Sequence, residues 1–262
     1  MNTLKGVKML MATVCLFFLG QVKAQNTFPE PLSGTELTKD FISANLIYPE
    51  NDLINKKSGK VAINLHIDTN GKGSNHQVKS TFSEAASPIA LDLVKKIIWK
   101  PATYISTPIE SDFEYEIDFN AKSYSRYWKK HERVAIPLEL EADDSYEIFD
   151  NKQLEEYAHP YFSDGGNMGQ YIYGNLQFPA EAREREIQGT VRVSFVVETN
   201  GGVSNIIIVN SVGGGCDNEA IRLIQGTHWI PGIKNGKYVR TFNMQDITFR
   251  IGQRNYQDGN SY

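Results

Sequence analysis

The chain has 262 residues, of which 40% are hydrophobic and 22% charged, and its formal net charge is −4. This composition is ordinary for a globular protein and excludes a collagen-like, a disordered or a wholly membrane-embedded chain. The acidic balance argues against nucleic acid as a partner, because nucleic-acid-binding proteins usually carry a basic patch and a high pI. Two cysteines are too few for a disulfide framework.

Residues 1–24 have the features of a secretory signal peptide. Lys5 and Lys8 precede an apolar run over residues 9–20. Small residues then occupy the −3 and −1 positions of a predicted cleavage site after Ala24. The apolar run is shorter than the roughly 20 residues of a membrane-spanning helix. We therefore expect export to the periplasm, with an uncleaved inner-membrane anchor as the alternative. Cleavage removes three lysines and no acidic residue, which changes the formal charge from −4 to −7.

The chain repeats itself at a constant offset of 130 residues. Thr69-Asn70-Gly71 recurs as Thr199-Asn200-Gly201, and Trp99-Lys100-Pro101 recurs as Trp229-Ile230-Pro231. A repeat in register predicts two copies of one module, which we place at residues 27–120 and 157–252. Residues 121–156 are predicted to be a connector, either packed on a module as an extra strand pair or solvated and acidic.

Each copy contains the pattern of an α+β module. Apolar residues alternate with others over residues 61–68 and 191–198, as in a strand with one buried face, and each run ends in an Asn-Gly hairpin signal. Return strands are expected over 74–80 and 203–210, and last strands over 111–119 and 238–251. The helix between them is expected to begin at Ser87-Pro88 in the first copy and to end at Gly226 in the second.

The predicted fold class is thus α+β, with two tandem modules that each hold an antiparallel three-stranded sheet with helices packed on one face. The first hairpin arm is expected to be central and the last strand to lie on an edge. An unpaired edge is a template for another chain. It therefore makes a homodimer through edge strands possible.

The second copy resembles the C-terminal domain of TonB, the periplasmic end of the energy transducer that drives outer-membrane receptors. The residues that carry the resemblance are Gly165-Gly166, Tyr171-Ile172, Asn175, Leu176, Gln177, Phe178, Pro179, Ala182-Arg183, Gly189-Thr190-Val191, Asn200-Gly201-Gly202-Val203, Asp217, Ala220, Trp229-Ile230-Pro231-Gly232 and Asn235-Gly236. The first copy keeps Tyr48-Pro49 and Gly59 but has Asp52 and Leu53 where the second has alanine and arginine. The first copy is therefore interpreted as the degenerate one.

The resemblance implies that the second copy binds an extended segment of an outer-membrane TonB-dependent receptor, or of another envelope protein, by adding it to the sheet edge. The partner-binding residues expected on this basis are Asn175, Gln177, Phe178, Pro179, Arg240, Phe242 and Met244. For Phe178 and Pro179 the alternative is a structural contact between helix and sheet. TonB itself has a membrane anchor and a long proline-rich stretch, whereas the ten prolines here are spread along the chain. A binding or adaptor protein is therefore favoured, and a membrane-anchored energy transducer is the alternative.

No residue pattern indicates an enzyme, a metal site or a cofactor. The five histidines lack metal-ligand spacing, and Gly213-Gly214-Gly215 lacks the lysine and hydroxyl residue of a phosphate-binding loop. Cys216 is placed at a helix start, where the pKa of a thiol is expected to fall. It is the one candidate for reactivity, and the alternative is an inert residue at the start of the helix.

Overall fold

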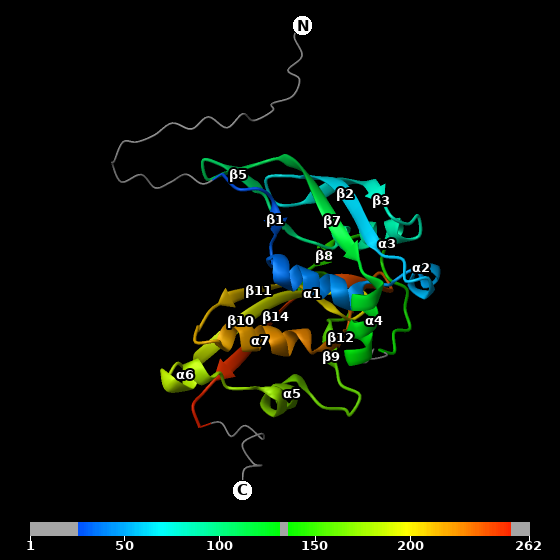
Figure 1. Ribbon diagram of the computed structural model, residues 1–262. Coiled ribbons are helices and arrows are strands. Elements are labelled where there is room, and N and C mark those ends of the chain that lie inside the picture. Colours follow the sequence, from blue (N-terminus) through cyan, green and yellow to red (C-terminus); the bar gives the residue numbers. More distant parts are fainter. Residues whose placement is uncertain (1–25, 132–135, 253–262) are drawn as a thin grey trace, which may run out of the picture.

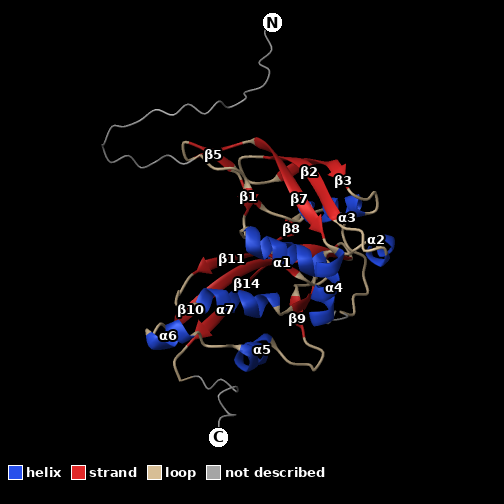
Figure 2. Cartoon of the chain, viewed as in Figure 1, coloured by secondary structure: helices blue, strands red, loops and turns tan. Residues whose placement is uncertain are grey.

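The structure is a computed structural model that describes residues 26–131 and 136–252. The predicted signal peptide and its cleavage site lie outside the described residues. Within them the chain is a mixed α+β protein with seven α-helices and several antiparallel sheets (Figures 1 and 2).

The two halves of the chain contain the same order of elements. The first half contains β1 (Glu30–Pro31), α1 (Thr35–Asn45), α2 (Glu50–Ile54), β2 (Gly59–Ile67), β3 (Gly73–Thr81), α3 (Ala86–Lys95), β4 (Trp99–Lys100), β5 (Ala102–Tyr104), β6 (Thr107–Ile109) and β7 (Ser111–Phe119). The second half contains β9 (His159–Tyr161), α5 (Met168–Asn175), α6 (Ala180–Glu184), β10 (Gly189–Val197), β11 (Val203–Asn210), α7 (Cys216–Gln225), β12 (His228–Ile230), β13 (Gly232–Lys234) and β14 (Lys237–Phe249). Strand β14 is continuous where the first half is broken between β6 and β7 at Glu110.

Each half is built on an antiparallel sheet with its first hairpin arm in the centre. The strand order is β3-β2-β7 in the first sheet and β11-β10-β14-β13 in the second. Helix α3 contacts β2 and β3, and α7 contacts β10 and β11. The central arm and the helical layer are as the sequence predicts. Helix α3 begins at Ala86, slightly before the expected Ser87-Pro88, and the last strand of the second sheet ends at Phe249 rather than Ile251.

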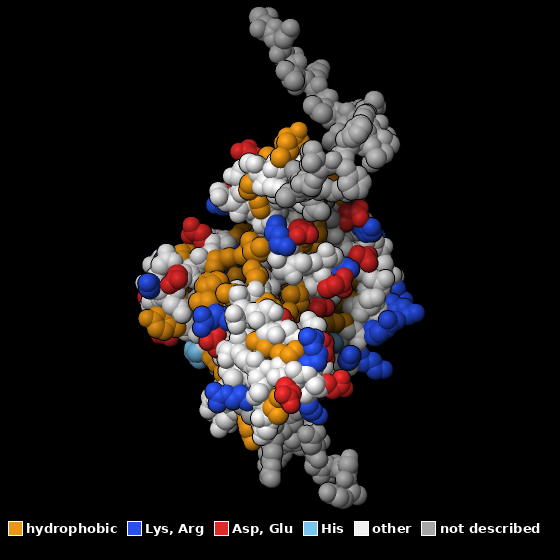
Figure 3. All heavy atoms as spheres, turned by 90° about the vertical axis from the view of Figure 1, so that its left-hand side faces the viewer, with side chains coloured by type: hydrophobic (Ala, Val, Ile, Leu, Met, Phe, Trp, Pro, Cys, Tyr) orange, Lys and Arg blue, Asp and Glu red, His pale blue; other side chains and the backbone are white. Residues whose placement is uncertain are grey.

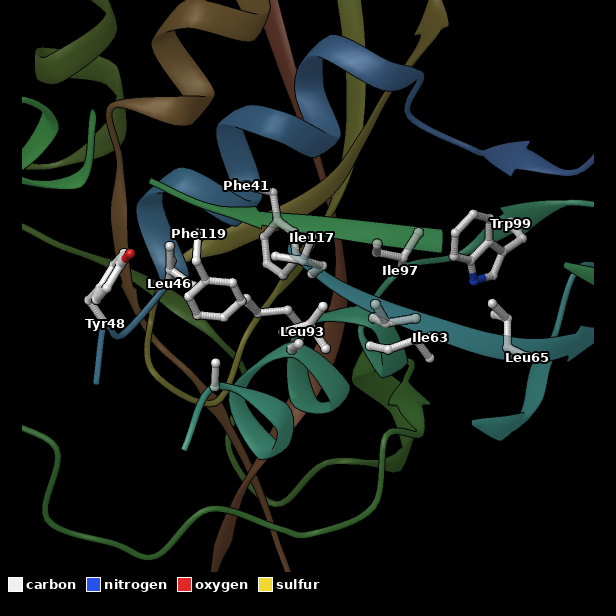
Figure 4. Packing of buried hydrophobic residues seen from close by; sticks show 14 of the residues in the cluster. Phe41, Leu46, Tyr48, Ile63, Leu65, Leu93, Ile97, Trp99, Ile117 and Phe119 are labelled. Atoms are coloured by element: carbon white, nitrogen blue, oxygen red, sulfur yellow. The ribbon is translucent and has the colours of Figure 1, made fainter. Parts of the chain in front are cut away.

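Alternating apolar residues of the central strands form the floor of two separate hydrophobic cores. In β2 the side chains of Val61, Ile63 and Ile67 are fully buried, and β10 buries Val191, Val193 and Val197 in the same way. Figure 4 shows the first core, where side chains from the helices and the sheet converge: Phe41, Leu46, Tyr48, Leu93, Ile97, Trp99, Ile117 and Phe119.

The repeated Asn-Gly and Trp residues meet in space, which explains why both recur. Gly201 has a φ of +79°, and a Cβ built on it would lie 2.3 Å from the carbonyl oxygen of Trp229. A Cβ built on Gly71 would likewise lie 1.9 Å from the carbonyl oxygen of Trp99. Only glycine fits, because the turn needs a positive φ and the tryptophan strand passes directly against it. The backbone N–H of Trp229 donates to the Gly201 carbonyl at 2.9 Å.

The two halves pack on each other through α1, which lies between them in Figure 1. Helix α1 contacts β11, and its Leu37 packs against the core of the second half. The side-chain amide of Asn200 donates to Asn45 at 2.9 Å, and that of Gln225 donates to Asp40 at 3.1 Å. A helix of the first half therefore covers part of the second.

The connector between the halves packs on the first half through α4, while most of residues 136–156 are exposed, and its described residues do not form the expected strand pair. It contains helix α4 (Ala121–Lys130), the short strand β8 (Ile148–Phe149) and the 3-10 helix η1 (Asn151–Gln153). Helix α4 is capped by Asn120, whose side chain accepts from the Ser123 N–H, and it packs on the first core. Strand β8 pairs in parallel with β14.

The surface is mixed in charge. On the side of the molecule drawn in Figure 3, acidic and basic side chains are interspersed around hydrophobic ones. Across the described ranges, no helix combines the length and the apolar character needed to cross a membrane.

A candidate strand-addition edge

The candidate site is the outer edge of β14, the side of this strand that faces away from β10. Strand β10 pairs with β14 from Thr241 to Phe249, and β13 pairs with residues 237–239 on the same side. On the outer edge, residues 141–149 of the connector run beside residues 238–241. In the part of the chain that the structure describes, no strand pairs with the outer edge from Phe242 to Thr248.

The hydrogen bonds at Tyr238 show which backbone groups point to this outer edge. The Tyr238 N–H donates to the Glu141 carbonyl at 2.9 Å, and the Tyr238 carbonyl accepts from the Asp143 N–H at 2.8 Å. Because backbone groups alternate in direction along a strand, those of residues 242, 244, 246 and 248 also point outward. The side chain of Gln245 donates to the Asp246 carbonyl at 2.9 Å and so covers one of these acceptors.

The outward positions carry apolar side chains at one end and an ion pair at the other. Phe242 is 39% exposed and Met244 57% exposed, on the face of the sheet away from α7. We call this the back face. Further along, Arg192 and Asp246 form a two-pronged ion pair at 2.7 and 2.8 Å. The Arg192 hydrogen bond lowers the pKa of Asp246, and the same bond raises the pKa of Arg192.

The equivalent strand of the first half has a different edge. At the positions matching those of β14, strand β7 carries Asp112, Glu114, Glu116 and Asp118. Two of these carboxylates pair with lysines of their own sheet, Glu116 with Lys60 and Glu114 with Lys79. Charged side chains along an edge discourage pairing with another chain. The β14 edge is therefore the one better suited to accept a strand.

Arg240, expected on the edge as a partner contact, is instead buried, and this expectation is corrected. Its side chain is 4% exposed and donates to both oxygens of Glu198, at 2.9 and 3.0 Å. It also donates to the carbonyls of Lys96 and Tyr146, at 2.8 Å each. The first half and the connector cover this part of the back face, so a side chain that the strand pattern places outward becomes interior.

The predicted loop residues lie on the other face of the sheet. The Phe178 ring packs edge-on against Phe249, at 6.1 Å between centroids, and borders the second core. The Gln177 N–H donates to Glu219 at 2.6 Å, and the side chain of the exposed Asn175 donates to the Tyr171 carbonyl. Pro179 is the N-cap of α6. Phe178 therefore packs on the sheet, while Asn175 and Gln177 are exposed, and none of these residues gathers with Phe242 and Met244; their role in binding stays a prediction.

The structure places Cys216 at the start of α7, as the sequence predicts, but not in a reactive setting. Its side chain is fully buried, and burial, with Asp217 beside it, raises the pKa of the thiol instead of lowering it. His228 is partly buried, and burial lowers its pKa. Among the described residues no group of three or more histidine, cysteine or acidic side chains is arranged to hold a metal ion.

Sequence reasoning missed Glu198 and Tyr146, which fix Arg240. One signal was present. Glu198 directly follows β10 and carries the charge opposite to that of Arg240 on β14, whereas the matching residues of the first half, Asp68 and Glu110, are both acidic. An ion pair confined to one copy indicates a contact that the other copy does not make.

The family comparison agrees with the second half of this fold. Residues 174–251 match the family model of the Gram-negative bacterial TonB protein C-terminal. The match spans α6, α7 and the strands from β10 to β14, with the β14 edge included. It covers one copy, so the likeness of the first half to this family stays a prediction. No curated protein matches the chain.

Proposed function

We propose that the protein is a periplasmic binding or adaptor protein that recognises an extended segment of an outer-membrane receptor or another envelope protein. The segment adds to the outer edge of β14 along Phe242–Thr248. The family match to the TonB C-terminal domain supports interaction with an envelope protein, and the fold supports strand addition as the mode.

The observation that carries this proposal is an open edge with apolar side chains on it. Backbone groups at the edge supply the affinity of strand addition, and alternate side chains supply the specificity. Phe242 and Met244 are solvent-exposed, while their cross-strand neighbours Val196 and Ser194 are buried. A partner strand therefore finds an apolar surface beside it for side chains at two alternate positions. The Arg192–Asp246 pair marks the polar end of the site.

Binding is tested with a proline at the edge. The Met244 N–H points outward, so Met244→Pro removes no hydrogen bond to β10 but blocks an added strand. Synthetic peptides of the N-terminal segments of the TonB-dependent receptors of the same cell are the probes. We expect a receptor peptide that slows amide exchange at Met244 in the native chain to lose its affinity for Met244→Pro.

The matched control is Glu114→Pro, at the equivalent position of β7, which should leave peptide binding unchanged. If Met244→Pro binds the peptides as well as the native chain does, the edge is not the site.

The alternative is a membrane-anchored energy transducer for outer-membrane transport. The two roles differ in whether residues 1–24 are removed in the cell. N-terminal sequencing of the purified protein decides: a chain beginning at Gln25 agrees with the adaptor, and a chain that retains Met1 agrees with the transducer.

A further inference from the structure

Residues 141–149 of the connector, which we call the strap, occupy the part of the β14 edge that precedes the open stretch. Ala142 lies opposite Tyr238, Ile148 opposite Arg240 and Phe149 opposite Thr241, all in parallel orientation. The strap therefore pairs with this edge at two points, around Ala142 and at Ile148–Phe149, and only the second point has the form of an added strand. It comes from a distant part of the sequence, and its pairing stops where the open stretch begins.

The strap leaves the edge at a defined point. The carboxylate of Asp150 accepts from the Lys152 N–H at 3.1 Å, and the side chain of Gln153 accepts from the Asp150 N–H at 2.9 Å. This capping box starts helix η1 and turns the chain away immediately after Phe149. The backbone groups from Phe242 onward are thus open because the strap ends there.

Besides its backbone hydrogen bonds with Tyr238, the strap is held by contacts of Phe149 and Tyr146 with the edge and with the first half. The Phe149 ring is buried, with the ammonium of Lys234 3.8 Å from its centroid. The Tyr146 carbonyl accepts from Arg240 at 2.8 Å, and the Tyr146 hydroxyl donates to Asp92 at 3.1 Å. The rest of the strap is mostly exposed, including Glu141, Ala142 and Asp144.

We propose that the strap is a displaceable internal occupant of the β14 edge, which restricts partners to Phe242–Thr248 until a longer segment replaces it. The partner that replaces it is an extended segment parallel to β14 that begins with an aliphatic–aromatic pair. That pair takes the places of Ile148 and Phe149. This inference rests on the proposed function, since it concerns the same edge.

The strap is held by few contacts compared with the sheet itself. Strand β8 has two residues, whereas β14 pairs with β10 over nine consecutive positions. Elements with few buried contacts open locally at a lower free energy than the core of a domain. Displacing the strap therefore leaves the second sheet and its core in place.

The experiment measures amide hydrogen exchange in the full chain and needs no natural ligand. In the native chain the Tyr238 amide, bonded to the strap, should exchange slowly, and the outward Met244 amide should exchange fast. In Ile148→Ala/Phe149→Ala, exchange at Tyr238 should rise by about tenfold or more while Asn243, whose backbone faces β10, stays protected. Leu140→Ala, just before the strap and 39% exposed, is the control and should change neither amide.

The probe for the vacated edge is a synthetic peptide of residues 139–150 of this chain. It should restore protection at Tyr238 in the double variant. In the native chain it should not compete, because a tethered strap has an effective concentration on the order of millimolar.

Three outcomes overturn the proposal: unchanged exchange at Tyr238 in the double variant, exchange that rises equally at Asn243, or no restoration by the peptide. The proposed function has a separate readout, the protection of Met244 by receptor peptides, so the two can fail independently.

Discussion

Replacing Arg240 with leucine should destabilise the protein strongly, because it leaves the buried carboxylate of Glu198 without its counter-ion. Glu198 is fully buried, and its remaining side-chain partner is the hydroxyl of Ser204. The change also leaves the Lys96 carbonyl without the Arg240 donor. Breaking a buried ion pair by removing one partner costs about 3–5 kcal/mol. A domain is typically stable by only about 5–15 kcal/mol, so the loss is a large share of the total.

Urea unfolding followed by circular dichroism measures this cost. With a slope of about 2–3 kcal/mol per molar urea, the midpoint should fall by about 1–2 M. The control is Arg192→Leu, which breaks the ion pair between β10 and β14 that Arg192 forms with Asp246. That pair is half-exposed, so its loss should move the midpoint little.

The double variant Glu198→Leu/Arg240→Leu should recover much of the stability, because no charge is then left buried. Equal effects of Arg192→Leu and Arg240→Leu would refute the reasoning, since they would show that burial does not set the cost.

Three further predictions follow from single residues. Gly201→Ala should lower stability by about 1–3 kcal/mol in thermal melting, because of its positive φ and the close Trp229 carbonyl, whereas Gly174→Ala, with open space around it, should not. Burial, together with the Asp92 carboxylate that accepts a hydrogen bond from its hydroxyl, raises the pKa of Tyr146 to about 12. The stability that this neutral tyrosine contributes should be complete below pH 10 and lost as the pH rises from 10 to about 12, as seen in tyrosinate absorbance and urea midpoints against Tyr146→Phe. Cys216 should resist thiol reagents at pH 8 until urea unfolds the chain, and rapid labelling of the native protein would contradict its burial.

Local pattern was enough to predict the elements of each half. The alternation over residues 61–68 and 191–198 corresponds to β2 and β10, and the strand expected over 111–119 has those bounds as β7. Gly226 follows the last residue of α7. These predictions succeed because a strand with one buried face and a glycine that ends a helix are set by residues close together in the sequence.

Local pattern was insufficient for the connector. Helix α4 carries an amphipathic pattern, with Ala121, Tyr124 and Trp128 at helical spacing and basic residues between them, so this helix is the one part of the connector that its own sequence indicates. The two residues of β8 are too few for a periodic signal, and their partner strand lies about 90 residues away. Parallel pairing of this kind depends on the packing of the whole chain.

Of the residues expected at the candidate site, the sequence placed some correctly and others not. Phe242 and Met244 could be placed on an edge strand from the sequence, and the structure leaves both exposed there. Their role in binding stays a prediction. Arg240 belongs to the same alternating series, so the sequence predicts that its side chain is equally exposed. It is buried because the first half and the strap pack over it, which no residue near it in the sequence reveals.

Composition, charge and the 130-residue repeat by themselves determined an α+β protein made of two like halves, because hydrophobic periodicity and turn residues act over short range. The carboxylates that make the β7 edge less suited to strand addition are also visible in the sequence. The tertiary structure alone decided that the strap covers the start of the β14 edge and that Arg240 is buried there in an ion pair. The physical reason is that burial of a polar side chain and occupation of a strand edge depend on what packs against them, and here that is a segment distant in the chain.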